Sequence, residues 1–274
     1  MKVLVNGHSS YCYTGGRAFD PALPSLVMIH GVLNDHSVWA MQSRWFANHG
    51  WNVLAVDLPG HCRSAGPAPE SVEDAAKFIM ALLDALNIER AALVGHSWGS
   101  LIALETAAQL GSRASHLALV GTASPMKVSP ALLEAALNTP EAAIRMVNVF
   151  SRSTLCIPPS ALGPGTWTFE AGMALGRRVL ASNAEVNVFH CGFQACDRYI
   201  GAEDAIRKIT CPVHFVLGEQ DQMTPPKAAQ AMLNAARESG KQVSKALLPV
   251  GHNHMTEAPA ATLETLAQFF TQPK

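Results

Sequence analysis

Six short apolar runs, each followed by a turn that contains glycine, alternate with helical patterns along this chain of 274 residues. The runs cover residues 25–29, 51–56, 91–94, 117–120, 212–217 and 244–250. Apolar runs of this length, bounded by glycine and proline, are typical of parallel strands that are buried on both faces. Helices between such strands cover the faces of one sheet. The pattern therefore predicts the α/β class, with a mostly parallel, twisted sheet flanked by helices.

The helices between these runs can be located from their caps and their spacing. Ser71 and Asp74 resemble a capping box, and the apolar residues that follow recur at helical spacing as far as Leu86. One face of this helix is predicted to pack on the sheet. Further helices are predicted over residues 97–110, 225–237 and 255–270. A short strand and a turn are predicted at the beginning of the chain.

The composition is that of a folded protein with a sizeable core. Hydrophobic residues make up 49% of the chain, the net charge is −1, and Lys and Arg do not cluster. These features favour neither nucleic acid nor a membrane as a partner, and the longest apolar stretches are shorter than a membrane span. The six cysteines lack paired spacing, and residues 1–7 do not resemble a signal peptide. We therefore expect a reduced, cytoplasmic protein.

The alternation of strands and helices stops between residues 124 and 199. This stretch has helical pieces at 130–137, 141–150 and 171–181, a middle rich in proline and glycine at 158–165, and no convincing core strand. It predicts a helical cap, inserted between two strands and placed over one end of the sheet. The core domain would then comprise residues 1–123 and 200–274. The alternative is a set of long connecting helices on one face of the sheet.

The strongest local motif is Gly95-His96-Ser97-Trp98-Gly99. It matches G-x-S-x-G, and it follows an apolar run and precedes a helical pattern. This context is typical of a nucleophile elbow, a sharp turn that holds a serine in a strained backbone conformation at the carboxyl end of a sheet. The two glycines leave room for neighbouring backbone. Ser97 is therefore the predicted nucleophile, and the alternative is an ordinary turn between strand and helix.

A serine hydroxyl needs a base, and the expected chain order on this architecture is serine, then Asp or Glu, then histidine. Asp221 follows the run at 212–217, and His252 follows the run at 244–250. They are the predicted acid and base of a triad that folding brings together. Glu219 is the rival acid. His254 is the rival base, but its position at the start of a helix favours an exposed or capping role.

An oxyanion hole would stabilise the negative charge that develops on the substrate carbonyl oxygen. One donor is predicted to be the amide of Trp98, which follows the nucleophile. The second is predicted to be the amide of Val32, in the loop after the first predicted core strand. His30 and His96 are interpreted as structural histidines that brace these loops.

With these motifs in order, the chain resembles the α/β-hydrolase superfamily, and within it the capped bacterial esterases, lactonases and cofactor-free perhydrolases. The motifs are His30-Gly31, the segment DLPGHCRS at 57–64, the elbow, the segment GEQD at 218–221, and Gly251-His252 followed by Glu257 and Pro259. One departure is Cys62, which stands where relatives often have glycine. Relatives that act on alkyl halides or epoxides have Asp at the nucleophile position, so Ser97 favours acyl transfer.

The resemblance implies hydrolysis of a carboxylic ester, thioester or lactone through an acyl-serine. The alternatives are carbon–carbon bond hydrolysis or perhydrolysis on the same triad, or a non-catalytic ligand-binding protein. We expect a small or medium, mostly apolar substrate. We expect neither a cofactor nor a metal, since the H-x-H at 252–254 has no third ligand nearby and no phosphate-binding loop is present.

Apolar side chains of the predicted insertion are candidates for binding the substrate. Two interpretations stand for them, since they either line a pocket or form the small core of the insertion itself. The predicted substrate-binding residues are Met126, Trp167, Phe169 and Phe193, with Met173 and Phe189 as further candidates.

Overall fold

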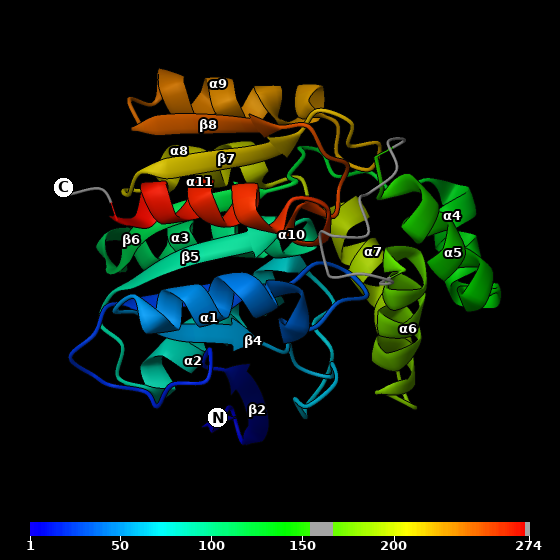
Figure 1. Ribbon diagram of the computed structural model, residues 1–274, viewed down its shortest axis with the longest axis horizontal. Helices are drawn as coiled ribbons and strands as arrows, with labels where there is room; N and C mark the ends of the chain where they lie inside the picture. The colour runs from blue at the N-terminus through cyan, green and yellow to red at the C-terminus, as the bar shows by residue number, and fades with distance from the viewer. Residues whose placement is uncertain (154–166, 272–274) are drawn as a thin grey trace.

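The computed structural model describes residues 1–153 and 167–271, and within them eight strands form one sheet in the order β1-β2-β4-β3-β5-β6-β7-β8 (Figure 1). The strands are β1 (Lys2–Val5), β2 (His8–Tyr13), β3 (Ser25–Ile29), β4 (Asn52–Val56), β5 (Ala91–His96), β6 (Ala114–Val120), β7 (Val213–Gly218) and β8 (Val243–Leu248). β2 pairs antiparallel with β1 and β4, and the other neighbouring strands are parallel. The predicted mostly parallel sheet is confirmed.

Helices cover both faces of this sheet (Figure 1). The helices of the described residues are α1 (Ala40–Asn48), α2 (Val72–Ala85), α3 (Trp98–Leu110), α4 (Pro130–Asn138), α5 (Pro140–Phe150), α6 (Thr168–Ala181), α7 (Val188–Arg198), α8 (Ala202–Lys208), α9 (Gln230–Glu238), α10 (His254–Glu257) and α11 (Pro259–Thr271). The predicted cap of α2 is present, since Ser71 Oγ accepts a hydrogen bond of 3.0 Å from the amide of Asp74. The single helix predicted over 255–270 is wrong. Ala258 separates α10 from α11, and Pro259, which has no N–H, begins the second helix.

The core has two layers because successive residues of a buried strand point to opposite faces. In β3, Leu26 and Met28 pack with Trp39 and with the aromatic residues of α1 and α11. Val27 and Ile29 pack on the other face, with residues of α2 and α3. This double burial explains why the strand is apolar at each position from Leu26 to Ile29. Because β3 to β8 all run parallel, their carboxyl ends lie at one edge of the sheet, where their loops meet.

Helices α4 to α7 lie together beyond this edge, between β6 and β7 in the chain order (Figure 1). They share a separate apolar cluster, in which Leu132, Ile144, Met173 and Phe189 are buried. The described residues of 124–199 include no strand. The segment at 158–165 lies outside the described residues, and the division into a core domain and a cap stays a prediction.

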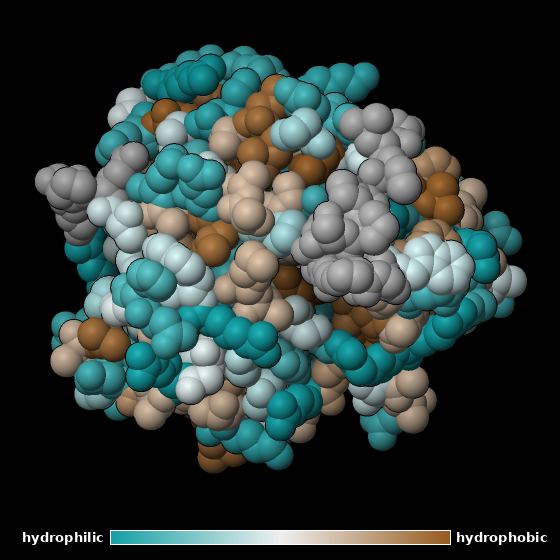
Figure 2. Space-filling view, viewed as in Figure 1, coloured by the Kyte–Doolittle hydropathy of each residue, from teal (hydrophilic) through white to brown (hydrophobic). Residues whose placement is uncertain are grey.

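The surface mixes polar and apolar residues over the face seen in Figure 2. Several exposed apolar side chains belong to the region of α4 to α7: Leu137, Val149, Phe150, Trp167 and Val186. Across residues 1–153 and 167–271, no helix is both long enough and apolar enough to cross a bilayer. Cys12, Cys62, Cys191, Cys196 and Cys211 are all free thiols.

Candidate active site

Ser97 lies in a tight turn between β5 and α3. Its backbone has φ 54 and ψ −123, a left-handed conformation that is strained for any residue with a side chain. The flanking glycines are required by close packing: a Cβ on Gly95 would overlap the backbone of Gly99, and a Cβ on Gly99 would overlap the carbonyl groups of Ile29 and His30. The elbow geometry is therefore present, with Ser97 in the wall of a cavity.

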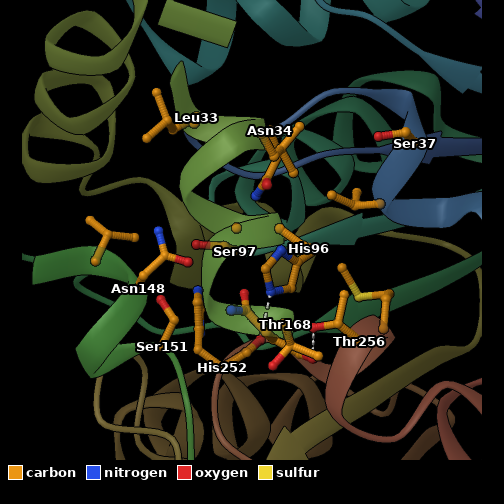
Figure 3. A pocket seen from close by; sticks show the side chains of 18 of the residues that line it. Leu33, Asn34, Ser37, His96, Ser97, Asn148, Ser151, Thr168, His252 and Thr256 are labelled. Carbon is orange, nitrogen blue, oxygen red and sulfur yellow. Dashed lines mark hydrogen bonds between the residues drawn. The ribbon is translucent and has the colours of Figure 1, made fainter. Parts of the chain in front are cut away.

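His252 and Asp221 meet at the same edge of the sheet, after β8 and β7. His252 Nδ1 is 2.8 Å from Asp221 Oδ2 and 3.0 Å from Thr224 Oγ1. An imidazole that donates from Nδ1 to a carboxylate has Nε2 free to accept a proton. His252 lines the same cavity as Ser97, and both side chains point into it in Figure 3. The structure thus brings the predicted acid, base and nucleophile to one place.

Asp221 is buried, with 3% of its surface exposed, and it accepts several hydrogen bonds. The donors are the amides of Met223 (2.8 Å) and Thr224 (2.7 Å), and the hydroxyl of Thr224 (2.8 Å). Burial by itself raises the pKa of Asp221, but His252 and the hydrogen bonds from Thr224 hold that pKa well below its usual range. The carboxylate is therefore ionised, whereas the rival acid Glu219 is exposed to solvent.

The loop that carries His252 is held by contacts with distant parts of the chain. The carbonyl oxygen of His252 is 2.8 Å from His96 Nε2, and its amide donates to the carbonyl of Ser151, also at 2.8 Å. The Glu257 carboxylate accepts a hydrogen bond of 3.1 Å from the amide of Gly251. Ser151 directly follows α5, so the proposed base is anchored partly to the region of α4 to α7. The roles of Thr224 and Ser151 were not predicted from the sequence.

The amides of Val32 and Trp98 remain the predicted oxyanion hole. Val32 lines the cavity, while the side chain of Trp98 is fully buried beneath the elbow. Neither amide has a hydrogen-bond partner among the residues that the structure describes. The two loops pack closely, because a Cβ on Gly31 would come 3.1 Å from the Cβ of Ser97. Two unsatisfied amides near a nucleophile are the donors that an oxyanion hole requires.

The cavity has a volume of about 610 Å³ and lies between the loops of the sheet edge and helices α5 to α7. Of the four predicted substrate-binding residues, Phe193 lines it. Met126 is buried in the core beside α7, Phe169 packs partly on the cluster of α4 to α7, and Trp167 is 66% exposed. The structure therefore does not bring these three into the described wall, and their predicted role stays untested.

The described wall also has polar groups that the sequence analysis did not single out. Arg44, Arg152 and Arg178 line the cavity together with Asn34 and Asn148. No acidic side chain is among its described lining residues. A cavity of this size, mostly apolar but with a few polar groups, is typical of a small-molecule site.

Comparison with known proteins agrees with this geometry. A sequence model of the family described as alpha/beta hydrolase fold matches residues 24–257. The chain belongs to this family. Among solved structures, the enol-lactonase from Burkholderia xenovorans LB400 superimposes with a TM-score of 0.81 at 20% identity, over 99% of this chain and 100% of that one. The esterase EaEST from Exiguobacterium antarcticum gives 0.81 at 19%, over 99% of each chain. At these identities the likeness shows the fold.

Curated relatives match this α/β hydrolase over shorter stretches. The 2-succinyl-6-hydroxy-2,4-cyclohexadiene-1-carboxylate synthase of Salmonella typhimurium is 37% identical over 89 residues, which are 32% of this chain and 34% of that enzyme. The first relatives are matched over only 24% to 36% of their own length. They connect the chain to a family of diverse reactions without naming its own.

The other histidines near the site of this α/β hydrolase have structural contacts. His30 Nε2 accepts a 3.2 Å hydrogen bond from the amide of Leu58, so its Nδ1 donates to the carbonyl of Gly31 at 2.8 Å. His254 is fully buried, and its Nδ1 is 2.9 Å from the carbonyl oxygen of His252. The exposed or capping role predicted for His254 is therefore wrong. Burial lowers the pKa of His254 to about 4, so the ring is neutral.

The loop at 57–64 departs from the common pattern at Cys62, which has φ 46. A positive φ explains why glycine is frequent there. Burial and the nearby Asp35 raise the pKa of the Cys62 thiol to about 12, so it stays protonated.

Asp35, His36 and Asp57 are close enough to share a metal ion. Their atoms already bond one another and their neighbours, with 2.7 Å between His36 Nδ1 and Asp57 Oδ1 and 2.6 Å between Arg178 and Asp35. These contacts join the loops after β3 and β4 to each other and to α6.

Proposed function

We propose that this α/β hydrolase is a serine hydrolase that cleaves a small or medium carboxylic ester, thioester or lactone through an acyl-serine intermediate. The observation that carries the proposal is the 2.8 Å contact between His252 Nδ1 and Asp221 Oδ2, with Nε2 left for the cavity that Ser97 lines. The strained elbow at Ser97 and the free amides of Val32 and Trp98 support it. The names of the structural neighbours, an enol-lactonase and an esterase, are in keeping with it.

The proposed reaction has two halves. Ser97 Oγ attacks the substrate carbonyl carbon while His252 Nε2 takes the hydroxyl proton, and the amides of Val32 and Trp98 stabilise the negative oxygen of the tetrahedral intermediate. The imidazolium, stabilised by Asp221, then gives its proton to the leaving alcohol or thiol. Water attacks the acyl-serine, His252 takes its proton, and collapse releases the acid and the free serine. No step requires a cofactor.

A fluorophosphonate probe tests this proposal directly. We expect the wild-type protein to be labelled, peptide mass spectrometry to place the label on Ser97, and Ser97→Ala to remain unlabelled. Turnover of a panel of esters, thioesters and lactones of graded acyl length would then define the reaction. An unlabelled Ser97 in folded protein, or a label on another residue, would contradict the proposed nucleophile. Labelling without turnover of any member would favour a ligand-binding protein.

A further inference from the structure

Asn148 is a polar residue on the buried face of α5. Only 6% of its surface is exposed, and its helix neighbours on that face are Ile144 and Ala143. Beside it lies the apolar cluster of α4 to α7, in which Ile144 and Met173 are buried. A buried carboxamide destabilises such a cluster unless its polar atoms find partners, so an asparagine here needs a reason.

The carboxamide of Asn148 is held in one orientation. Its Nδ2 donates a 2.9 Å hydrogen bond to the carbonyl of Ile144 and lies 3.7 Å from Met173 Sδ. Turning the amide over would set its oxygen against that carbonyl oxygen, so the contact fixes which end points away. Oδ1 is then left without a hydrogen-bond partner among the described residues. Asn148 lines the cavity, and Figure 3 shows it on the same side as the hydroxyl of Ser97.

The neighbouring helix leaves space for this oxygen. A Cβ on Gly172 of α6 would overlap Asn148 Oδ1. Glycine in the interior of a helix costs about 1 kcal/mol relative to alanine, so its presence at this contact fits a need for room. Gly172 itself lines the cavity. The contact between Asn148 of α5 and Gly172 of α6 thus leaves Oδ1 as an acceptor for a ligand in the cavity.

We propose that Asn148 Oδ1 accepts a hydrogen bond from an N–H or O–H group near the scissile carbonyl of the substrate, which makes Asn148 a specificity-determining residue. The inference rests on the proposed function, since it places this acceptor beside the reacting carbonyl. A carboxamide oxygen only accepts, so it selects substrates with a donor over isosteres without one. Sites that hydrogen-bond a substrate group reject the analogue that lacks it, because a buried polar atom is left unsatisfied.

Matched methyl esters test the selection, with turnover followed by acid release. Methyl N-acetylglycinate and methyl 4-oxopentanoate differ by N–H against CH₂. Methyl 3-hydroxybutanoate and methyl 3-methylbutanoate differ by O–H against CH₃. We expect kcat/KM to favour the donor in at least one pair by about 5- to 100-fold, the cost of leaving the acceptor without a partner once the substrate has excluded water from it. The pair that shows the preference identifies the donor as amide or hydroxyl. Equal rates within both pairs would overturn the proposal, and would be expected if the oxygen only held water.

Variants assign the preference to the carboxamide oxygen. Asn148→Leu should bring the ratio within each pair close to one. Gly172→Ala should reduce the ratio by displacing Oδ1. Asn138→Leu, an exposed position on α4, is the matched control and should behave as wild type. A preference that survives in Asn148→Leu would mean that another group selects the donor.

Binding separates this inference from the proposed function. Calorimetry on folded Ser97→Ala measures the affinity for N-acetylglycine against 4-oxopentanoate, and for 3-hydroxybutanoate against 3-methylbutanoate, without any turnover. We expect tighter binding of the donor acid, and loss of that difference on adding Asn148→Leu. This result would stand even if Ser97 proved not to be a nucleophile. Equal affinities within both pairs, or no measurable binding of any acid, would overturn the role of Asn148.

Discussion

The two sides of the cavity hold their functional groups by different means. On the sheet side, the backbone places them: Ser97 has φ 54, and Asp221 and His252 stand in the loops that follow β7 and β8. On the side of α4 to α7, helix packing places them, as with Phe193 and Asn148. Where tight turns and strand ends fix the backbone, few other residues can take the place of the functional ones. A helix surface, in contrast, accepts many side chains of similar shape. This difference predicts that substitutions in the loops of the sheet edge abolish the reaction, whereas substitutions on α4 to α7 change which substrates are preferred.

The largest effect is expected at the elbow. Ser97→Ala should lower kcat by about 10⁴-fold or more, because the acyl-enzyme route is lost and only binding and the oxyanion hole remain. The measurement is turnover of the best ester of the panel, with thermal unfolding as the check of folding. Activity within tenfold of wild type would refute the assignment of the nucleophile.

His252→Ala should cost about as much as Ser97→Ala, because the two residues act as one unit. His254→Ala is the matched control from the same loop. It should leave kcat within about tenfold, since the ring of His254 is hydrogen-bonded to the backbone carbonyl of His252 and its loss should disturb the position of the base without removing a reacting group. An inactive His254→Ala beside an active His252→Ala would reverse the assignment of the base.

Glu257 connects the loop of His252 with the end of α5, and its replacement should have an intermediate effect on kcat. Its carboxylate accepts hydrogen bonds from the amide of Gly251 (3.1 Å) and from that of Ser153 (3.0 Å), just after α5. Glu257→Ala should lower kcat by about 10- to 100-fold with KM little changed, because the loop of His252 loses its brace. Glu257→Gln keeps an acceptor and should recover most of the loss.

The exposed Glu264 of α11 supplies the control for that experiment, and Glu264→Ala should match wild type. A positioning role is separated from a purely structural one by the split between kcat and KM and by the rescue with Gln. If Glu257→Gln were no better than Glu257→Ala, or if KM rose in step with the fall in kcat, the brace would not act through His252.

The same contrast explains what the sequence could predict. The parallel strands were recognised because burial on both faces gives a run of consecutive apolar residues, such as Leu26 to Ile29 in β3. The elbow could be located because its two glycines are needed locally, within five residues. Asp221 and His252 could be proposed because strand ends and chain order restrict where a triad forms.

The remaining parts depend on contacts between distant segments, which leave no local pattern. The carbonyl of Ser151 holds His252 although the two residues are 101 apart in the sequence, and a backbone carbonyl has no sequence signature. Asn148 could have been suspected as a polar residue on an apolar helix face, but only the packing of α6 shows that its oxygen is free. His254 was predicted to be exposed or capping from its position at the start of a helix. That prediction was wrong because a polar ring can be buried once it finds a partner, here the carbonyl of His252.

The smallest expected effect is on the free energy of unfolding, and it comes from buried histidines of the sheet and its loops. His61, His214 and His254 belong to the sheet core or its loops, and burial lowers the pKa of each to about 4. In the unfolded chain their pKa is near 6.5. Between these values the unfolded state binds more protons than the folded state, so the free energy of unfolding decreases as the pH falls from about 6.5 to 4.

His214 is the best position to test this dependence, because it lies in β7, away from the cavity, with Ser244 Oγ at 2.7 Å and Thr265 Oγ1 at 2.9 Å from its two ring nitrogens. His214→Gln keeps a donor and an acceptor but cannot be protonated. The fall in the free energy of unfolding should become shallower in this variant by about 1 kcal/mol per pH unit, somewhat less than the full contribution of one titrating group. Urea unfolding at intervals between pH 7.5 and 5 measures both slopes.

The exposed His49 provides the control, because His49→Gln should keep the wild-type slope. If His214→Gln also kept that slope, the neutral ring in β7 would not contribute to the pH dependence of the free energy of unfolding. That dependence would then come from other groups of the sheet and its loops.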